Sequence, residues 1–435
     1  MRDLEGFVIA LLYHTKRKGH CDLSYIEDKP LKNLLEKLAV HPHFNDVFEV
    51  EIAENLICSC LYTVMSQGKI SFNNSDAIQF LNDLYESLKV NVNEYWIIFP
   101  LKGASLTQTI RYKDFVFITG DSDEKINVLT RLGKTTRNKA VERATHTRIS
   151  RSEHFFLHPL LAIRINHQNN YVRNVAKRFS FYSNSILQAI YWGKVHPKYE
   201  PSLIHNGFGI DNANHLLIYG KKDSQISHMP ADFDTTCKLD LDFLNEPTYI
   251  KLFSAIFDEL MYKGGSGERI IVNKFLNGFK FLKNAIDLER KRQLYQGLSI
   301  PLLLLTTASE SILLKREDQK RSRLSVLYSR LVKMDNLLNT EIAEILHKIY
   351  GWRSEFVHGG TEIHKDFNED FSDGVTTNTY INYKKFLANL LSKTVYFISL
   401  VERRSQGQTM YSKEEIWYKY LNNQWKKGKS ILKKT

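Results

Sequence analysis

The residues best suited to chemistry lie near the C-terminus, in the segment from Arg353 to His358. An arginine that stays protonated is followed five positions later by a histidine that titrates near neutral pH. Histidine can act as acid or base, and arginine can clamp phosphate oxygens and stabilise the charge that develops there. The pair therefore suits cleavage of RNA by its own 2′-hydroxyl, giving a 2′,3′-cyclic phosphate and a 5′-hydroxyl, with no metal ion or cofactor required.

One copy of this segment does not make a complete site. In a regular helix, residues five positions apart differ by about 140° in direction and about 7.5 Å in rise, so Arg353 and His358 diverge. Gly359 and Gly360 permit a left-handed helix end, which predicts a distorted last turn at His358. Two copies facing each other across a two-fold interface would complete the site. A surface arginine and a histidine that stabilises a helix end would give the same spacing.

The elements that must position this pair form a helical bundle. Apolar residues recur at helical spacing in five stripes, over residues 271–286, 302–313, 324–334, 342–352 and 387–401. Each stripe is narrow, as expected for helices that share one core and expose polar backs. The fourth stripe leads directly into Arg353 and His358.

Two segments of this bundle carry a family resemblance. The fourth helix reads Tyr350-Gly351-Trp352-Arg353-Ser354-Glu355-Phe356-Val357-His358-Gly359, and the second contains Thr307-Ala308-Ser309-Glu310-Ser311-Ile312-Leu313. With the order of the helices, these segments resemble the HEPN superfamily, and more closely its Apea-like branch. The resemblance covers residues 267–403, and the chain departs from the family at Ser309, where leucine is usual.

The resemblance implies a homodimeric, metal-independent endoribonuclease with Arg353 and His358 at the cleft between subunits. It implies a setting in phage defence by abortive infection or in a toxin system. Ser354 would orient the arginine or the phosphate, Glu310 would hold Arg353 through an ion pair, and Tyr350 is a further supporting residue. Because some relatives are catalytically silent, the alternative is a non-catalytic HEPN module that binds RNA or protein.

The charge balance agrees with an RNA partner, such as tRNA or mRNA. The 435-residue chain has a formal net charge of +12, which favours polyanions without naming one. Basic residues cluster within 131–151 and at the start of the third helix, and the candidates for RNA contact are Arg137, Lys139, Arg143, Arg148, Lys320, Arg321 and Arg323. A mobile, solvated basic loop would explain the first cluster equally well.

The whole chain is predicted to be α+β, with four regions. Residues 1–92 are helical, 93–247 are mixed α/β, 248–410 form the all-α HEPN bundle and 411–435 form a basic tail. Within the mixed region, short aromatic and β-branched runs predict strands at 95–99, 115–118, 160–165 and 215–219, and a helix at 171–191. This region would sense a protein or phage-derived trigger, or hold substrate.

Several other classes of protein are disfavoured. Four scattered cysteines do not form a disulfide framework, and Gly264–Gly267 lacks the lysine and hydroxyl residue of a phosphate loop. The apolar run at residues 7–13 is too short and too acidic at its start for a signal peptide, and no run reaches the length of a membrane span. We therefore expect a cytoplasmic protein without a cofactor or bound metal.

Overall fold

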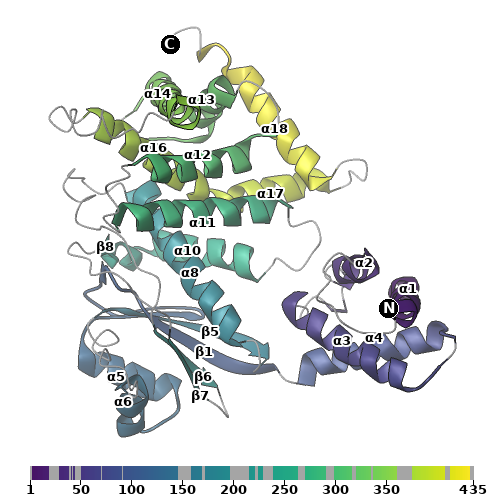
Figure 1. Cartoon of the computed structure of the whole chain (residues 1–435). Helices are drawn as coiled ribbons and strands as arrows, with labels where there is room; N and C mark the ends of the chain where they lie inside the picture. The colour runs from purple at the N-terminus through teal and green to yellow at the C-terminus, as the bar shows by residue number, and fades with distance from the viewer. Residues whose placement is uncertain are drawn as a thin grey trace. The chain divides into compact units, whose positions relative to one another are not determined.

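The computed structural model divides into two compact units (Figure 1). The first comprises residues 1–95, 165–174 and 262–269, and the second comprises residues 96–164, 175–261 and 270–435. The structure describes residues 2–18, 29–38, 41, 43–44, 50–69, 71–90, 92–145, 158–168, 172–195, 215–220, 224–228, 239–262, 270–290, 298–315, 320–334, 337–359, 375–406 and 412–431.

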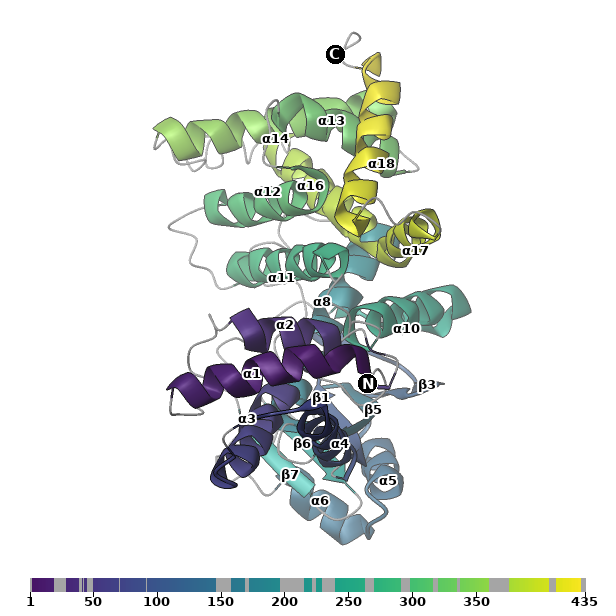
Figure 2. The same cartoon turned by 90° about the vertical axis from the view of Figure 1, so that its right-hand side faces the viewer.

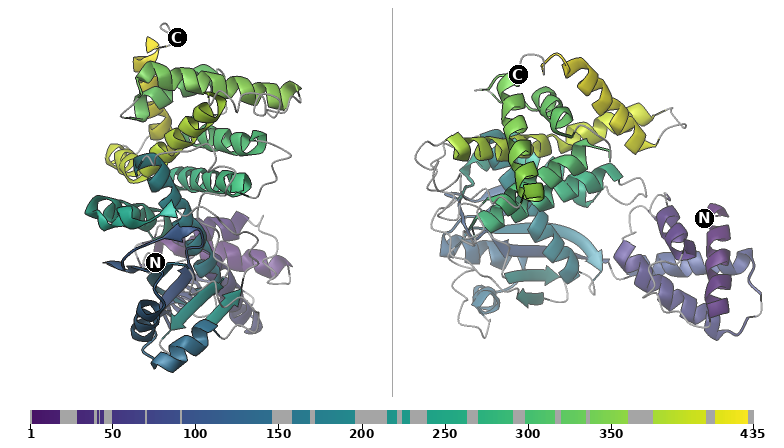
Figure 3. Two further views of the ribbon diagram at one scale, coloured as in Figure 1. Left: turned by 90° about the vertical axis from the view of Figure 1, so that its left-hand side faces the viewer. Right: turned by 45° about the horizontal axis from the view of Figure 1, so that its top comes forward.

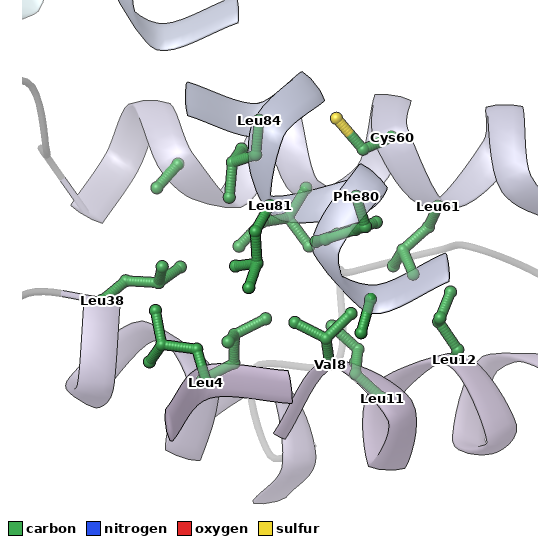
Figure 4. Packing of buried hydrophobic residues seen from close by; sticks show 14 of the residues in the cluster. Leu4, Val8, Leu11, Leu12, Leu38, Cys60, Leu61, Phe80, Leu81 and Leu84 are labelled. Atoms are coloured by element: carbon green, nitrogen blue, oxygen red, sulfur yellow. The ribbon is translucent and has the colours of Figure 1, made fainter. Parts of the chain in front are cut away.

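The first unit is a cluster of four helices around an apolar core (Figure 4). They are α1 (Glu5–Lys18), α2 (Lys29–Leu38), α3 (Val50–Ser66) and α4 (Asn74–Val90). Leucines from all four helices, together with Phe80, are buried in this core. Reciprocal hydrogen bonds cap the start of α4: the Asn73 side chain accepts from the backbone N–H of Ser75 and Asp76, and Asp76 accepts from the backbone N–H of Asn73.

A six-stranded sheet lies in the second unit, with strand order β3-β4-β5-β1-β6-β7. The strands are β1 (Val92–Pro100), β3 (Ile110–Tyr112), β4 (Phe115–Ile118), β5 (Leu160–Gln168), β6 (His215–Gly220) and β7 (Ser224–His228). The β3–β4, β4–β5 and β6–β7 pairs are antiparallel. Two shorter strands, β2 (Ala104–Ser105) and β8 (Leu239–Asp240), pair in parallel beside it. The strands expected at 95–99, 115–118, 160–165 and 215–219 are all present.

Helices cover both faces of this sheet (Figures 1 and 3). Because side chains alternate along a strand, Phe115 and Phe117 point to one face, where their rings contact Phe253 of α10 (Pro247–Met261). Phe179 of α8 (Val172–Ile190) joins the same aromatic cluster through Phe257. On the opposite face, β4 packs against α5 (Ser122–Leu132) and α6 (Arg137–Thr145).

The bundle helices stack on the α10 side in successive layers (Figure 2). They are α11 (Ile270–Arg290), α12 (Ser299–Leu313), α13 (Lys320–Leu331), α14 (Asn339–Gly359), α16 (Val375–Ser392), α17 (Thr394–Ser405) and α18 (Lys413–Gly428). Their apolar stripes match those of the sequence, except that the fifth stripe is divided into α16 and α17 at Lys393. At the coarse level the α+β fold class is confirmed.

The sheet and the bundle belong to one compact unit, so no unit boundary falls at the expected residue 247. The short π-helix that follows α8, at Tyr191–Val195, lies directly on α16. The Asn389 amide donates to the carbonyl of Gly193 at 2.8 Å. Lys384 and Glu289, both almost fully buried, form an ion pair at 2.7 Å, and the Lys384 ammonium lies over the Trp192 ring. A buried ion pair is costly unless its charges are well partnered, and the Tyr380 hydroxyl also donates to Glu289.

The expectation of a basic tail from residue 411 is wrong for residues 412–428. These residues form α18, which begins with a capping box between Ser412 and Glu415. Trp417 is fully buried, and its indole N–H donates to the carbonyl of Ile312 at 2.9 Å. The helix is amphipathic, because its lysines project outward while its aromatic face packs on the bundle. Lysine content alone therefore gave the wrong prediction.

Candidate active site

Three helices bring the central residues of the candidate site together. Glu310 lies in the last turn of α12, Lys320 is the first residue of α13, and Arg353 lies in the second half of α14. Each helix is fixed by a buried apolar face, with Leu305 on α12 and Leu346 on α14 both fully buried. The three charged side chains are thereby held at adjacent helix surfaces.

Glu310 is the centre of this cluster. Its Oε2 atom accepts from the Lys320 ammonium at 2.7 Å, and its Oε1 atom lies 3.5 Å from Nη2 of Arg353. The Tyr350 hydroxyl donates to the same Oε1 atom at 3.3 Å. The Glu310 side chain is only 17% exposed, so removing these partners would leave a costly, poorly solvated charge. The expected contact between Glu310 and Arg353 is therefore present.

A buried network of hydroxyl groups lies beneath Glu310. The Ser309 hydroxyl contacts the hydroxyls of Tyr328 and Tyr383 at 2.5 and 2.7 Å, and donates to the carbonyl of Leu305 at 3.0 Å. Burial raises the pKa of Tyr328 and Tyr383 well above the usual value. These groups stay protonated and act as donors. Ser309 is thus the shared partner of two tyrosines, which a leucine could not be.

Tyr350 lies close to both this network and the charged cluster, and its hydroxyl bonds Glu310. Burial, followed by the nearby Tyr383 and the Glu310 carboxylate, raises the pKa of Tyr350 well above its usual value. Its hydroxyl therefore remains a proton donor to Glu310 throughout the physiological range. This bond holds Oε1 in place beside Arg353, so the guanidinium has a fixed anchor on one side.

Arg353 has donors beyond those that Glu310 engages. Its side chain is 24% exposed, and its buried Nε–H has no partner among the described residues. Guanidinium presents five N–H donors in a planar fork, and the Glu310 contact at 3.5 Å is an ion pair longer than a good hydrogen bond. The anchored arginine therefore retains capacity to bind a phosphate group.

His358 lies apart from this cluster on the same helix. Helix α14 ends at Gly359, so His358 lies in its last turn, and Gly360, which was expected to help form a left-handed helix end, lies outside the described residues. The His358 and Ser354 side chains are both exposed. Within the described part of the chain, no hydrogen bond or ion pair joins Arg353 to His358, in accordance with their divergence of about 140° around the helix. A composite site made by two copies remains a prediction.

The predicted RNA-contact residues have different environments. Lys320 is held by Glu310, and the exposed Arg137 pairs with Asp123. Arg321 and Lys139 are exposed, whereas Arg323 is half-buried. Arg143 lies in helix α6, without a described side chain, and Arg148 lies outside the described residues. Residues 137–145 are thus helical, which differs from the loop considered for this basic segment.

Sequence reasoning missed His347, which shares a face of α14 with His358. The signal was available: His347, Gly351, Ser354 and His358 are spaced four, three and four residues apart, which places them on one side of a helix. Burial and the neighbouring Arg321 both lower the pKa of His347. This histidine is therefore neutral at physiological pH.

Comparisons with models of known protein families, with curated proteins and with solved structures gave no match to this chain. Among the residues that the structure describes, no group of three or more histidine, cysteine, aspartate or glutamate side chains is arranged to hold a metal ion. None of the described helices combines the length and the hydropathy needed to cross a membrane.

Proposed function

We propose that this chain is a metal-independent endoribonuclease of the HEPN type. The observation that carries the proposal is the anchored Arg353: a partly exposed guanidinium paired with Glu310, which Tyr350 holds in turn, on the helix whose last turn carries His358. A cation held in this way can stabilise charge that develops on a phosphate without having to reorganise during the reaction. The resemblance of the 350–359 segment to the HEPN motif supports the same assignment.

In the proposed reaction a histidine removes the proton of the RNA 2′-hydroxyl, and the oxygen attacks the adjacent phosphorus. The bond from phosphorus to the 5′ oxygen breaks, and a second acid protonates that oxygen. Arg353 binds the non-bridging oxygens, where negative charge accumulates. The products are a 2′,3′-cyclic phosphate and a 5′-hydroxyl, so the bonds and protons balance without a cofactor.

Two copies supply the groups that one copy lacks. One chain offers a single His358, directed away from Arg353, whereas the reaction uses a base and an acid. An isologous dimer that brings two α14 ends together would place two histidines and two arginines at one phosphate. Val357, which is 44% exposed beside His358, offers apolar surface for such an interface. Defence against phage or a toxin function would be the setting, as the family resemblance implies.

The test is cleavage of total tRNA and mRNA in EDTA, compared with Arg353→Ala and His358→Ala. Arg403→Ala is the matched control, because Arg403 is an exposed helical arginine on α17 that donates to the carbonyl of Ser399 in its own helix. We expect cleavage by the wild type and the control, and loss of cleavage in both site variants. Equal activity in all four proteins would reject the proposal.

A non-catalytic RNA-binding or protein-binding module is the second candidate. The separation of Arg353 from His358 within one chain favours it, since no complete catalytic pair exists there. The two candidates differ in one measurable respect, because a binding module retains RNA without producing new 5′-hydroxyl ends. Toxicity of the wild type on expression in cells, absent for His358→Ala, would support the enzyme even if purified protein requires a trigger.

A further inference from the structure

The exposed face of α14 that includes His358 continues toward the start of the helix. His347, Gly351, Ser354 and His358 all lie within an arc of about 60° around the helix axis. His347, Ser354 and His358 are exposed, and Gly351 is half-buried. The face therefore combines two imidazoles and a hydroxyl along about 16 Å of helix, and at Gly351 no side chain covers the helix backbone.

Arg321 of α13 lies over that gap. A Cβ atom built on Gly351 would meet Nη2 of Arg321 at 3.6 Å, an ordinary van der Waals distance. The charge of Arg321 is also felt by His347. The 3.6 Å distance places the guanidinium along the His347–Gly351 part of the face, in accordance with its effect on the pKa of His347. The absence of a side chain at Gly351 gives the guanidinium direct access to the helix surface.

The three basic residues at the start of α13 differ in their availability. Lys320 is bonded to Glu310, and Arg323 is half-buried. Arg321 is exposed, and among the described residues no carboxylate forms an ion pair with it. Of the three, Arg321 is therefore the cation best placed to bind a further phosphate.

We propose that Arg321, His347, Gly351, Ser354 and His358 form a track for single-stranded RNA, in which Arg321 binds a backbone phosphate away from the position of cleavage. Gly351 and His358 differ by about 10 Å in helix rise, which is about three nucleotide steps of 3.4 Å in a stacked strand. The proposal rests on the ribonuclease assignment only in taking His358 as the cleavage position.

The chemistry of the face favours a single strand over a duplex. The face is one helix wide, and Arg321 of the neighbouring α13 is the cation beside it. Duplex RNA is instead bound through contacts spread over successive grooves. A neutral imidazole such as His347 offers an aromatic surface on which an unpaired base can stack. Arg321 supplies the charge that holds the backbone, and its planar fork suits phosphate oxygens.

Binding is tested without cleavage, using a fluorescent single-stranded 2′-O-methyl oligonucleotide in an anisotropy titration. We expect Arg321→Ala to weaken binding about five- to tenfold and to reduce the slope of log affinity against log salt by about 0.7. Arg330→Ala is the control, because Arg330 is an exposed arginine at the other end of α13. It should bind as the wild type does.

A second pair of variants tests the face itself. Gly351→Ala should keep the fold, since its Cβ would make only an ordinary contact with Arg321, and should weaken binding less than Gly351→Gln does. Gly351→Gln places a long side chain across the track and should weaken binding as Arg321→Ala does. Unchanged affinity and salt slope for Arg321→Ala, or no binding of the single strand by the wild type, would overturn the proposal.

A cleavage assay on unmodified RNA distinguishes the ribonuclease proposal from the RNA-track proposal. If His358→Ala abolishes cleavage while Arg321→Ala leaves both binding and cleavage unchanged, the track is rejected and the enzyme retained. If the wild type neither cuts RNA nor is toxic on expression, while Arg321→Ala loses affinity for the single strand, the track is retained and the enzyme rejected. Thermal unfolding of each variant confirms that the exposed substitutions leave the fold intact.

Discussion

A double-mutant cycle at Ser309 and Tyr328 measures the buried hydrogen bonds that lie beneath Glu310. Ser309→Ala removes the 2.5 Å partner of the Tyr328 hydroxyl, which is fully buried, while Tyr383 keeps a bond to the carbonyl of Leu305 at 3.2 Å. An unsatisfied buried donor costs about 1–3 kcal/mol, so we expect a loss of about 2 kcal/mol. Tyr328→Phe leaves Ser309 with its other partners and should cost about 1 kcal/mol.

The double variant should lose less than the sum of the two single changes. With both hydroxyls gone, no unsatisfied donor remains at position 328, so we expect a total loss of about 1.5 kcal/mol and an interaction energy of about 1.5 kcal/mol. Urea unfolding followed by tryptophan fluorescence suits this cycle, because every tryptophan lies in the second unit: Trp96, Trp192, Trp352, Trp417 and Trp425. Additivity within about 0.3 kcal/mol would refute the proposed network.

Two further predictions concern the junction of the sheet layer with the bundle. Gly193→Ala should destabilise the second unit by several kcal/mol, because the new Cβ would lie 2.4 Å from backbone atoms of α16. Gly120→Ala, whose Cβ meets nothing within 4 Å, is the matched control, and equal urea midpoints for the two variants would contradict this close packing. Burial, together with Lys194 and Lys333, lowers the pKa of Lys393 from 10.5 to about 8 in the folded protein. Between these two pH values Lys393 is protonated in the unfolded chain and neutral in the folded protein. The unfolded state therefore binds more protons, and the free energy of unfolding rises with pH. After allowance for the partial exposure of Lys393, the free energy of unfolding of the wild type should rise by about 1 kcal/mol relative to that of Lys393→Met between pH 7.5 and 10.5. Urea unfolding at each pH measures this difference, and parallel profiles of the two proteins would contradict it.

The sequence predicted the elements that have a clear periodicity. The helical stripes over residues 271–286 and 342–352 correspond to α11 and α14, and the aromatic runs at 95–99 and 115–118 correspond to β1 and β4. These features depend on residues close together in the chain, which is why a single sequence reveals them.

Features that depend on distant residues were not predictable. The Ser309 network joins hydroxyls that are 19 and 74 positions apart, and only the packing of three helices brings them together. The same holds for Lys384 and Glu289 at the sheet–bundle junction. Helix α18 was missed for a different reason: Ile416, Trp417 and Tyr420 recur at helical spacing, but the lysines around them dominated the interpretation.

The candidate site was predictable in part. The motif placed Glu310 and Arg353 in one site, and the structure brings their side chains within 3.5 Å. Lys320 was assigned to RNA contact, and its ammonium bonds Glu310, because the first residue of α13 lies beside the last turn of α12. Catalysis by His358 remains a prediction, since it depends on a second copy.

The proposed ribonuclease is best tested by sequencing the ends of RNA cut by the full chain in EDTA. We expect 2′,3′-cyclic phosphate and 5′-hydroxyl ends that accumulate with the wild type and disappear with His358→Ala and with Arg353→Ala. A substrate with 2′-deoxyribose at the cleavage position should resist, because it lacks the nucleophile. Ends carrying 5′-phosphate, cleavage of the deoxy substrate, or the same ends from the His358→Ala protein would contradict the account.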